Sequence, residues 1–329
     1  MKVAIVILNW NGKELLEQFL PSIIEHSTSA NIYVADNAST DESLNIINNN
    51  FSSVKIIKNK TNLGFAGGYN NALKEVNEEI ICLLNSDIEV TKNWLTPIIE
   101  QFKTEDNTAI IQPKILDFKD KNKFEYAGAA GGYIDKYGYP YCRGRIFSTI
   151  EEDTNQYNNN KDIFWASGAC FFIRNSVFKK LDGFDQSFFA HMEEIDLCWR
   201  VKNHGYNISY NGNSHVYHVG GATLKNTNPK KTFLNFRNSL LMLVKNAQKP
   251  IFSLILIRLC LDGIAGILFL LKLKPLHCFA IIKAHFSFYS KLTFALKQRK
   301  SLNQNIKHYK IASIVWSYYI NRKTTFNKL

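Results

Sequence analysis

The acid Asp87 stands at the end of an apolar run that extends from Ile80 to Leu84. Such a run is typical of a buried strand in an open α/β sheet, and ligands bind outside the carboxyl ends of these strands. A carboxylate at that edge is suited to hold a hard divalent cation against phosphate oxygens. The alternative is a plain turn, because Asn85, Ser86 and Asp87 are all turn-forming residue types. The pattern therefore predicts either a cation-binding strand end or a turn.

Three acids, Glu193, Glu194 and Asp196, crowd the start of a predicted helix further along the chain. Any one of them is explained by the favourable interaction of an acid with the N-terminal end of a helix dipole. Three acids together repel one another, and this repulsion raises the pKa of a carboxylate toward the range of a general base. We therefore expect a proton-accepting carboxylate here, with dipole stabilisation as the alternative.

A further acid, Asp36, ends the strand expected at residues 32–35. Its carboxylate is interpreted either as a turn residue or as a hydrogen-bond acceptor for a nucleobase or ribose. Just beyond it, Ser39 and Glu42 form a capping-box pattern, which predicts a helix that reaches about Asn49.

A glycine-rich loop at residues 62–72 contains Gly64, Gly67 and Gly68 and passes into a predicted helix. Glycines at a strand-to-helix junction let backbone N–H groups approach a bound ligand closely. The spacing is not the G-x-G-x-x-G fingerprint of dinucleotide-binding folds, and no P-loop lysine is present. The loop therefore argues against a Rossmann dehydrogenase.

Strands and helices that could position these residues alternate along the first third of the chain. The apolar patterns predict strands at residues 3–8, 32–35, 54–57, 80–84 and 109–111, with a helix at residues 13–26. This alternation predicts an α/β fold with a mostly parallel sheet, right-handed crossovers and flanking helices. Residues 113–162 are less regular, and we expect a hairpin or an extended loop there.

Four ordered motifs carry a resemblance to a known family. They are Val-Ile-Leu-Asn-Trp-Asn-Gly at 6–12, Val-Ala-Asp-Asn-Ala-Ser-Thr-Asp at 34–41, Asn-Leu-Gly-Phe-Ala-Gly-Gly-Tyr-Asn at 62–70 and Leu-Leu-Asn-Ser-Asp at 83–87. In this order they resemble family 2 glycosyltransferases with the Rossmann-like GT-A fold, and most of all the bacterial rhamnosyltransferase branch. The resemblance covers about residues 3–240 and implies a nucleotide-sugar donor.

The resemblance implies roles for the strand-end residues. Asp36 would contact the base, and Asp87 would ligate Mg²⁺ or Mn²⁺ together with His218, for which a purely structural role is the alternative. The implied donor-binding residues are Asn9, Asp36, Asn62, Gly64, Gly67, Asn70 and Asn85. The family's metal motif is often Asp-x-Asp, and Asn85 takes its first position here. One carboxylate fewer should weaken cation binding when no diphosphate is present.

The resemblance also implies an acceptor side. The segment at 164–174 resembles the family's Trp-x-x-Gly-Ala strand beside the donor sugar, and this places Trp165, Gly168 and Ala169 there; a buried strand with a bend at Gly168 is the alternative. The acidic segment resembles the motif Glu-Asp-x-Asp-Leu-x-x-Arg, whose second acid is the catalytic base. That position is Glu194, with Glu193 in reserve and Asp196 supporting the helix start on the acceptor side.

The charge of the chain is concentrated in its C-terminal part. Of 40 Lys and Arg residues, 15 lie from Lys245 onward, together with a single acid, Asp262. The apolar run 251–273 is long enough to span a bilayer, but Arg258 and Asp262 near its middle would cost about 5 kcal/mol unless they pair. They are four residues apart, as in a helical ion pair. We therefore favour an interfacial or core-docked helix over a spanning one.

These observations predict a GT-A domain at residues 1–245 and a basic, apolar, helical, membrane-associating tail at 246–329. We expect an inverting, metal-assisted transfer from a dTDP-rhamnose or UDP-sugar type donor to a lipid-linked or polysaccharide acceptor. We expect a cytoplasmic enzyme, peripheral on the inner face of the plasma membrane, that binds anionic lipid and no nucleic acid. The alternatives are a nucleotide-binding protein without catalysis, and a membrane- or nucleic-acid-binding protein.

Overall fold

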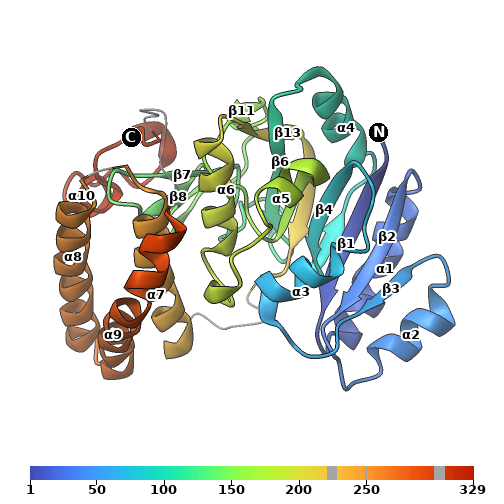
Figure 1. Cartoon of the computed structure of the whole chain (residues 1–329). Coiled ribbons are helices and arrows are strands. Elements are labelled where there is room, and N and C mark those ends of the chain that lie inside the picture. Colours follow the sequence, from blue (N-terminus) through green and yellow to red (C-terminus); the bar gives the residue numbers. More distant parts are fainter. Residues whose placement is uncertain (221–227, 249, 300–307) are drawn as a thin grey trace.

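The computed structural model describes residues 1–220, 228–248, 250–299 and 308–329. Figure 1 shows a large sheet with helices on both faces and, beside it, a bundle formed by the later helices. Within the described residues, nine strands form this sheet in the order β11-β13-β6-β12-β4-β1-β2-β3, with β5 paired to β13. The strands are β1 (Val3–Asn9), β2 (Ala30–Asp36), β3 (Lys55–Lys58), β4 (Ile80–Asn85), β5 (Ile88–Val90), β6 (Thr108–Asp117), β11 (Lys161–Asp162), β12 (Cys170–Arg174) and β13 (Asn207–His218).

The sheet is mostly parallel, as the alternating pattern predicts. Strands β1, β2, β3 and β4 pair in parallel, and so do β6 and β13. Strand β12 lies antiparallel between β4 and β6. The flanking helices are α1 (Lys13–His26), α2 (Ser43–Asn50), α3 (Gly64–Ala72), α4 (Leu95–Thr104), α5 (Asn175–Lys180) and α6 (Glu193–Asn203).

Two hydrophobic cores cover the two faces of the sheet, because successive side chains of a strand point to opposite sides. Ile5 and Ile7 of β1 pack into the core that contains Leu16 of α1. Ala4 and Val6 belong to the other core, on the side of α3, α6 and the later helices. All of these side chains are buried, so the carboxyl ends of the strands are held in fixed positions.

The register brings the carboxyl ends of the central strands level with one another. Asn9 pairs with Asp36, and Leu8 pairs with Asn85. The expected capping box is wrong, because α2 begins at Ser43 and not after Ser39. The Ser39 hydroxyl instead accepts hydrogen bonds from the Asn11 backbone N–H at 2.9 Å and from Asn9 Nδ2 at 3.1 Å, and it ties the ends of β1 and β2 together.

A smaller antiparallel sheet confirms the hairpin expected within residues 113–162. Its strands are β7 (Gly132–Ile134), β8 (Pro140–Cys142), β9 (Arg145–Ile146) and β10 (Thr149–Ile150). The last part of the chain, with α10 (Ile314–Tyr319), returns to this sheet, where the Ile314 N–H donates to Asp135 Oδ2 at 2.9 Å.

The helices α7 (Pro229–Asn246), α8 (Ile251–Leu271) and α9 (Pro275–Gln298) pack together beside the main sheet (Figure 1). Arg258 and Asp262 of α8 are buried and face the protein. Arg258 donates to the Tyr137 carbonyl and to the Ser239 hydroxyl, both at 2.8 Å, and Tyr139 donates to Asp262 at 3.1 Å. The charges therefore point inward, as a docked helix requires.

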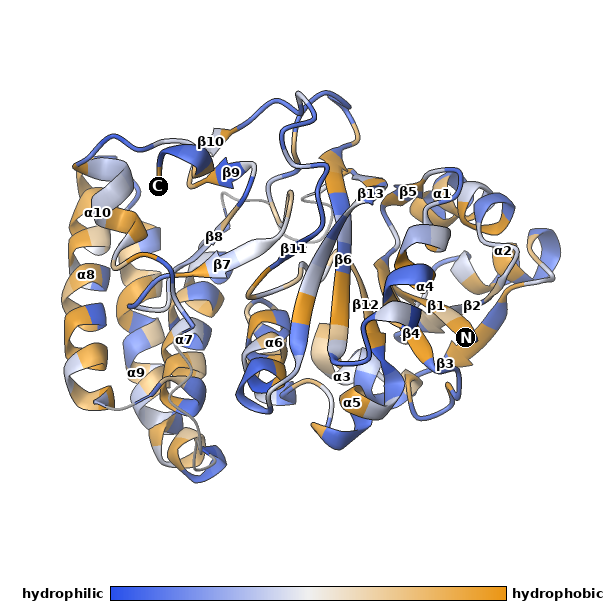
Figure 2. Cartoon of the chain, turned by 90° about the horizontal axis from the view of Figure 1, so that it is seen from above, coloured by the Kyte–Doolittle hydropathy of each residue, from blue (hydrophilic) through white to orange (hydrophobic). Residues whose placement is uncertain are grey.

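The opposite side of α8 and α9 is apolar and exposed. Figure 2 colours most of α8 as hydrophobic. Phe252 and Leu271 of α8 are 83% and 75% exposed, and Phe286 of α9 is 73% exposed. Among the described residues, α8 is the one helix that is long and apolar enough, by length and composition only, to cross a membrane.

Candidate active site at the carboxyl edge of the sheet

The ends of β1 and β2 form one polar pair. Asn9 Nδ2 donates to Asp36 Oδ1 at 3.2 Å, and Asp36 Oδ2 accepts from the Ser39 backbone N–H at 3.1 Å. Both residues are buried. Within the described chain, Asn9 Oδ1 has no hydrogen-bond partner, so it is an orphaned acceptor at this edge. The structure thus brings Asn9 and Asp36 together where the donor nucleotide was expected.

The loop that precedes α3 is held by Asn37, a residue that the sequence analysis missed. Asn37 Nδ2 donates to Asn62 Oδ1 at 2.9 Å and to the Gly64 carbonyl at 3.1 Å. Gly64 has φ +68°, and a Cβ there would lie 2.8 Å from the Phe189 side chain. Only glycine fits this position, because its backbone is left-handed and the space is filled.

Two residues predicted to bind the donor are occupied in other ways. Asn70 Nδ2 donates to the Phe184 carbonyl at 2.7 Å, and Asn70 Oδ1 accepts from the Phe184 N–H at 2.9 Å. Both atoms of the amide therefore bind backbone and join α3 to the segment at 184, and the nucleotide contact of Asn70 stays a prediction. At Gly67 a Cβ would lie 2.8 Å from Leu63 Cβ, so the packing of the loop itself requires a small residue.

Asp87 and His218 meet at the end of β4. Asp87 Oδ1 lies 3.1 Å from His218 Nε2, and the other ring nitrogen lies 3.3 Å from Glu125 Oε1. Asn85 Nδ2 is 3.5 Å from His218 Nε2. Burial alone would lower the pKa of His218, but hydrogen bonds to the two carboxylates raise its pKa to about 10. Glu125 was not foreseen, because it lies in the irregular segment where no periodic pattern marks it.

These residues fit a divalent cation that binds mainly through its substrate. Asp87 would supply a carboxylate oxygen and His218 an imidazole nitrogen, which lie 3.1 Å apart and are both ligand types that a divalent cation accepts. His218 would have to lose its proton to become a ligand. Among the described residues, no group of three or more His, Cys, Asp or Glu side chains could hold a metal ion. Such a sparse ligand set suits an ion whose other ligands are diphosphate oxygens and water.

The two adjacent glutamates at the start of α6 differ in accessibility. Glu193 is buried at 5% exposure, whereas Glu194 is partly exposed. Burial raises the pKa of Glu194 to about 7, and burial together with the charge of Glu194 raises the pKa of Glu193. The Oε2 atoms of both have no hydrogen-bond partner among the described residues. Glu194 is therefore the better placed of the two to meet a substrate hydroxyl.

Gly168 lies where three parts of the chain meet. They are the glycine-rich segment at residues 62–72, called the donor loop below, strand β12 and helix α6. A Cβ at Gly168 would lie 3.3 Å from the Phe65 ring of the donor loop and 3.8 Å from Cβ and Cγ of Glu194. The neighbouring Ala169 carbonyl accepts from the Asn85 N–H at 2.9 Å, at the end of the strand that leads to Asp87.

The carboxylates of Glu125 and Glu194 both act electrostatically on the thiol of Cys142. Burial raises the pKa of the Cys142 thiol, and the charges of Glu125 and Glu194 raise it further. Glu125 contacts His218, the partner of Asp87. The Cys142 thiol therefore lies within electrostatic range of Glu125, which contacts the candidate metal ligand His218, and of the candidate base Glu194.

Trp165 and Asp196, which were expected on the acceptor side, are both buried in the structure. Trp165 is buried, donates from Nε1 to the Tyr133 carbonyl at 2.8 Å and packs on Gly132 of β7. Trp165 therefore anchors the small sheet, and its contact with the sugar stays a prediction. The Trp is visible in the sequence, but its partner in β7 is not.

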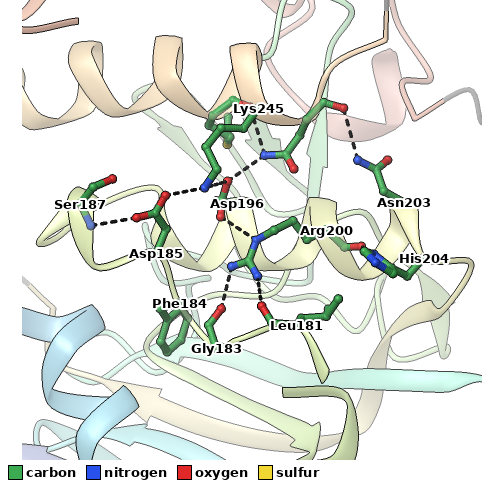
Figure 3. Close-up of polar contacts among 12 residues, drawn as sticks. Leu181, Gly183, Phe184, Asp185, Ser187, Asp196, Arg200, Asn203, His204 and Lys245 are labelled. Carbon is green, nitrogen blue, oxygen red and sulfur yellow. Dashed lines mark hydrogen bonds and ion pairs between the residues drawn. The ribbon is translucent and has the colours of Figure 1, made fainter. Parts of the chain in front are cut away.

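Figure 3 shows the surroundings of Asp196, which is fully buried. Its carboxylate accepts from Arg200 Nε at 2.9 Å and from Asn246 Nδ2 at 2.7 Å, and it pairs with Lys245 Nζ at 2.9 Å. Lys245 also pairs with Asp185 at 2.6 Å. Asp196 thus links α6 to α7, and both of its carboxylate oxygens have partners.

Comparison with known proteins agrees with the motifs. Residues 4–182, more than half of the chain, match the family model described as Glycosyl transferase family 2. A low-salt glycan biosynthesis hexosyltransferase from Haloferax volcanii is 26% identical over 213 residues, which cover 63% of each chain. The chain therefore spans less than two thirds of that relative. An N-acetylglucosaminyl-diphospho-decaprenol L-rhamnosyltransferase from Mycobacterium tuberculosis is 22% identical over 231 residues, which cover 65% of this chain and 75% of the relative.

Solved structures confirm the fold. A mannosyltransferase from Pyrobaculum calidifontis, in complex with GDP-Man and Mn²⁺, matches with a TM-score of 0.54 and 11% identity over 88% of this chain and 87% of that chain. Residues 1–349 of S. aureus TarS, in complex with UDP-GlcNAc, match with a TM-score of 0.53 and 14% identity over 89% of this chain and 76% of that chain. These likenesses establish the GT-A architecture.

Proposed function

Because this chain belongs to glycosyl transferase family 2, we propose that it transfers a hexosyl group from a nucleotide-diphosphate sugar to an acceptor hydroxyl with inversion. The observation that carries the proposal is the placement of Glu194. It is a carboxylate with a raised pKa, and its Cβ and Cγ lie 3.8 Å from the position of a Cβ at Gly168, next to the Ala169 carbonyl that binds the end of β4.

The reaction is a single displacement at the anomeric carbon. The Glu194 carboxylate takes the proton of the acceptor hydroxyl as its oxygen bonds to that carbon. The bond from the anomeric carbon to the diphosphate oxygen breaks, and the nucleoside diphosphate leaves with that electron pair. Asp87 and His218 would hold Mg²⁺ or Mn²⁺, which when bound supplies positive charge to the leaving diphosphate. Asn9, Asp36, Asn62 and Asn85 orient the nucleotide, and Gly168 and Ala169 leave room for the sugar.

The donor is a dTDP-rhamnose or UDP-sugar type compound, and the acceptor is a lipid-linked sugar or a growing polysaccharide. In support, one relative is named as a rhamnosyltransferase acting on N-acetylglucosaminyl-diphospho-decaprenol, and one structural neighbour is described with UDP-GlcNAc. The donor loop around Gly64 carries no dinucleotide fingerprint, which agrees with a nucleotide-sugar ligand.

We assign membrane association to residues 246–329 and catalysis to residues 1–245, so that the enzyme works at the inner face of the plasma membrane. The exposed apolar side chains of α8 and α9 support this assignment. Exposed lysines, Lys272, Lys274 and Lys283, lie among them and suit anionic lipid headgroups. Arg258 and Asp262 pair toward the protein, so the helix can present a purely apolar side to lipid.

The test is a donor screen followed by a turnover assay. The melting temperature of the full chain is measured in the presence of UDP-GlcNAc, UDP-glucose, dTDP-rhamnose or GDP-mannose, each with Mn²⁺ or Mg²⁺. The donor that raises the melting temperature is then assayed for release of nucleoside diphosphate in the presence of lipid-linked sugar. A protein that binds nucleotides without catalysis gives a higher melting temperature but releases no nucleoside diphosphate. If no donor raises the melting temperature, the proposal is contradicted.

A further inference from the structure

The segment between Phe188 and Glu193 has an unusual backbone. Phe189, His191 and Met192 have φ values of 65°, 68° and 73°. These values lie in the left-handed region, which residues with a side chain adopt rarely because the Cβ approaches the following carbonyl. Three such residues among four, directly before the candidate base, require contacts that hold them in place.

Asn238 of α7 supplies these contacts. This residue is fully buried, and its Nδ2 lies 3.1 Å from the Phe188 carbonyl, 2.9 Å from that of Ala190 and 2.7 Å from that of His191. Its Oδ1 accepts from Arg237 Nε at 2.9 Å, which fixes the orientation of the amide. Both hydrogen-bonding atoms of the Asn238 side chain therefore have partners, Nδ2 in this turn and Oδ1 in the adjacent residue Arg237.

The turn connects the two halves of the candidate site. At one end the Phe189 carbonyl accepts from the Phe65 N–H at 3.1 Å, and the Phe189 ring lies against Gly64 of the donor loop. At the other end the Met192 carbonyl accepts from the Asp196 N–H at 2.9 Å in the first turn of α6. Met192 is the N-cap residue of α6 and makes no side-chain cap. The backbone of the turn therefore determines where α6 starts and where Glu194 points.

We propose that Asn238 is a positioning residue, which holds the turn at residues 188–192 in its left-handed conformation and so aims Glu194 at the acceptor hydroxyl. The proposal rests on the proposed glycosyl transfer. Helix α7 contacts α6 and the turn before it: Asn238 binds the turn, and Lys245 binds Asp196 in the first turn of α6. Asn238 is not a catalytic residue, because it touches the turn and not the substrate.

The experiment compares Asn238→Ala with Ser239→Ala. Ser239 is the next residue of α7 and is equally buried, but its hydroxyl accepts from Arg258 of α8 and does not contact the turn. Asn238→Ser, which keeps one donor, is a milder third variant. We measure kcat and the donor KM on the full chain, and hydrogen exchange of the amides at residues 188–196.

For Asn238→Ala we expect kcat to fall by about 10- to 100-fold with a donor KM changed by less than about 3-fold, because misplacement of a catalytic group by about 1 Å has an effect of this size. Exchange at residues 188–196 should rise. Ser239→Ala should change neither kcat nor the exchange at residues 188–196. Asn238→Ser should give values of both between those of wild type and Asn238→Ala. Equal losses in Asn238→Ala and Ser239→Ala would indicate a general stability effect and overturn the proposal.

The two readouts separate this inference from the proposed function. Faster exchange with an unchanged kcat overturns the link to catalysis, and unchanged exchange overturns the clamp itself. If the wild-type chain transfers no sugar, the proposed function fails, and the hydrogen-exchange result alone then decides whether Asn238 holds the turn.

Discussion

The carboxylate of Asp87 lies 3.1 Å from the imidazole of His218, although β4 and the end of β13 are far apart in sequence. The contact arises because β5, which directly follows Asp87, pairs antiparallel with β13 and places His218 opposite Ile88. The residue pair is therefore fixed by sheet register and not by a flexible loop, and this rigidity is what a preorganised cation site needs.

We predict that Asp87→Asn weakens Mn²⁺-dependent nucleotide binding by about 10- to 100-fold, because the substitution removes a carboxylate that would bind the cation. The change is measured by titration calorimetry of UDP or dTDP with and without Mn²⁺. Glu89→Gln, in the adjacent β5, is the matched control, since Glu89 pairs with Lys121 at the surface. Equal metal dependence in Asp87→Asn and wild type would exclude Asp87 as a ligand.

We predict that Glu194→Gln lowers kcat by about 10²- to 10⁴-fold and leaves the affinity for nucleotide unchanged, because only the proton acceptor is lost. Glu193→Gln should lower kcat by less than about 10-fold, since the pKa of the buried Glu193 is raised and its neutral form resembles glutamine. Steady-state release of nucleoside diphosphate measures both. The reverse order of effects would assign the base to Glu193.

The pH dependence follows from the pKa of Glu194, which burial raises to about 7. A base must be deprotonated, so kcat should fall about 10-fold for each pH unit below about 7. The charged and titratable groups near Glu194 are Glu193 and the thiols of Cys142 and Cys198. A profile that stays flat down to pH 5, near the ordinary carboxyl pKa, would contradict a buried base.

The same raised pKa should cost stability at high pH. The folded protein holds the Glu194 proton up to about pH 7 and the unfolded chain up to about 4.5, so the free energy of unfolding falls as the pH rises through this window. Glu194→Gln removes the charge and should be more stable than wild type at pH 8, by about 1–2 kcal/mol after allowance for partial exposure. At pH 4 the two should denature at the same urea concentration, and a difference there would point to another cause.

Much of the donor side was predictable from sequence, because the strands that carry it have short apolar patterns and end in polar residues. Asn9, Asp36 and Asp87 lie at the expected edge for this reason. Residue type alone could not reveal the partners of a polar side chain. Asn70 and Trp165 bind backbone carbonyls contributed by distant segments, and the sequence pattern did not predict these partners.

Some functional candidates gave no local signal at all. Glu125 follows β6 in an irregular segment, and only the pairing of β6 with β13 brings it to His218. Asn238 lies between Arg237 and Ser239 in α7, and its role depends on the unusual backbone of a turn about fifty residues earlier. Left-handed φ values at residues such as Phe189 and Met192 are a tertiary effect, which neither propensity nor periodicity predicts.

Asp196 tests whether the buried network between α6 and α7 is structural. Asp196→Ala leaves Lys245 without one of its two carboxylates and Arg200 without its ion pair. Breaking a buried pair in this way should lower the free energy of unfolding by about 3–5 kcal/mol. Asp120→Asn is the control, because Asp120 pairs with Lys123 at the surface, where an ion pair contributes little to stability. Urea denaturation measures both, and a loss below 1 kcal/mol for Asp196→Ala would contradict the structural role.

The apolar side of α8 and α9 should carry membrane binding. Phe252→Ser and Phe286→Ser each remove a side chain that is more than two thirds exposed. Each should weaken binding to vesicles by about 10-fold or more, since a buried Phe contributes about 1.5–3 kcal/mol. Flotation with vesicles that contain phosphatidylglycerol measures the loss, and vesicles of phosphatidylcholine alone should bind less because Lys272 and Lys274 then lack anionic partners. Ile150→Ser, an exposed apolar residue of β10, is the control. If the wild-type chain does not float with either vesicle, the surface has another occupant, and a concentration-dependent mass in solution would identify a second copy of the chain.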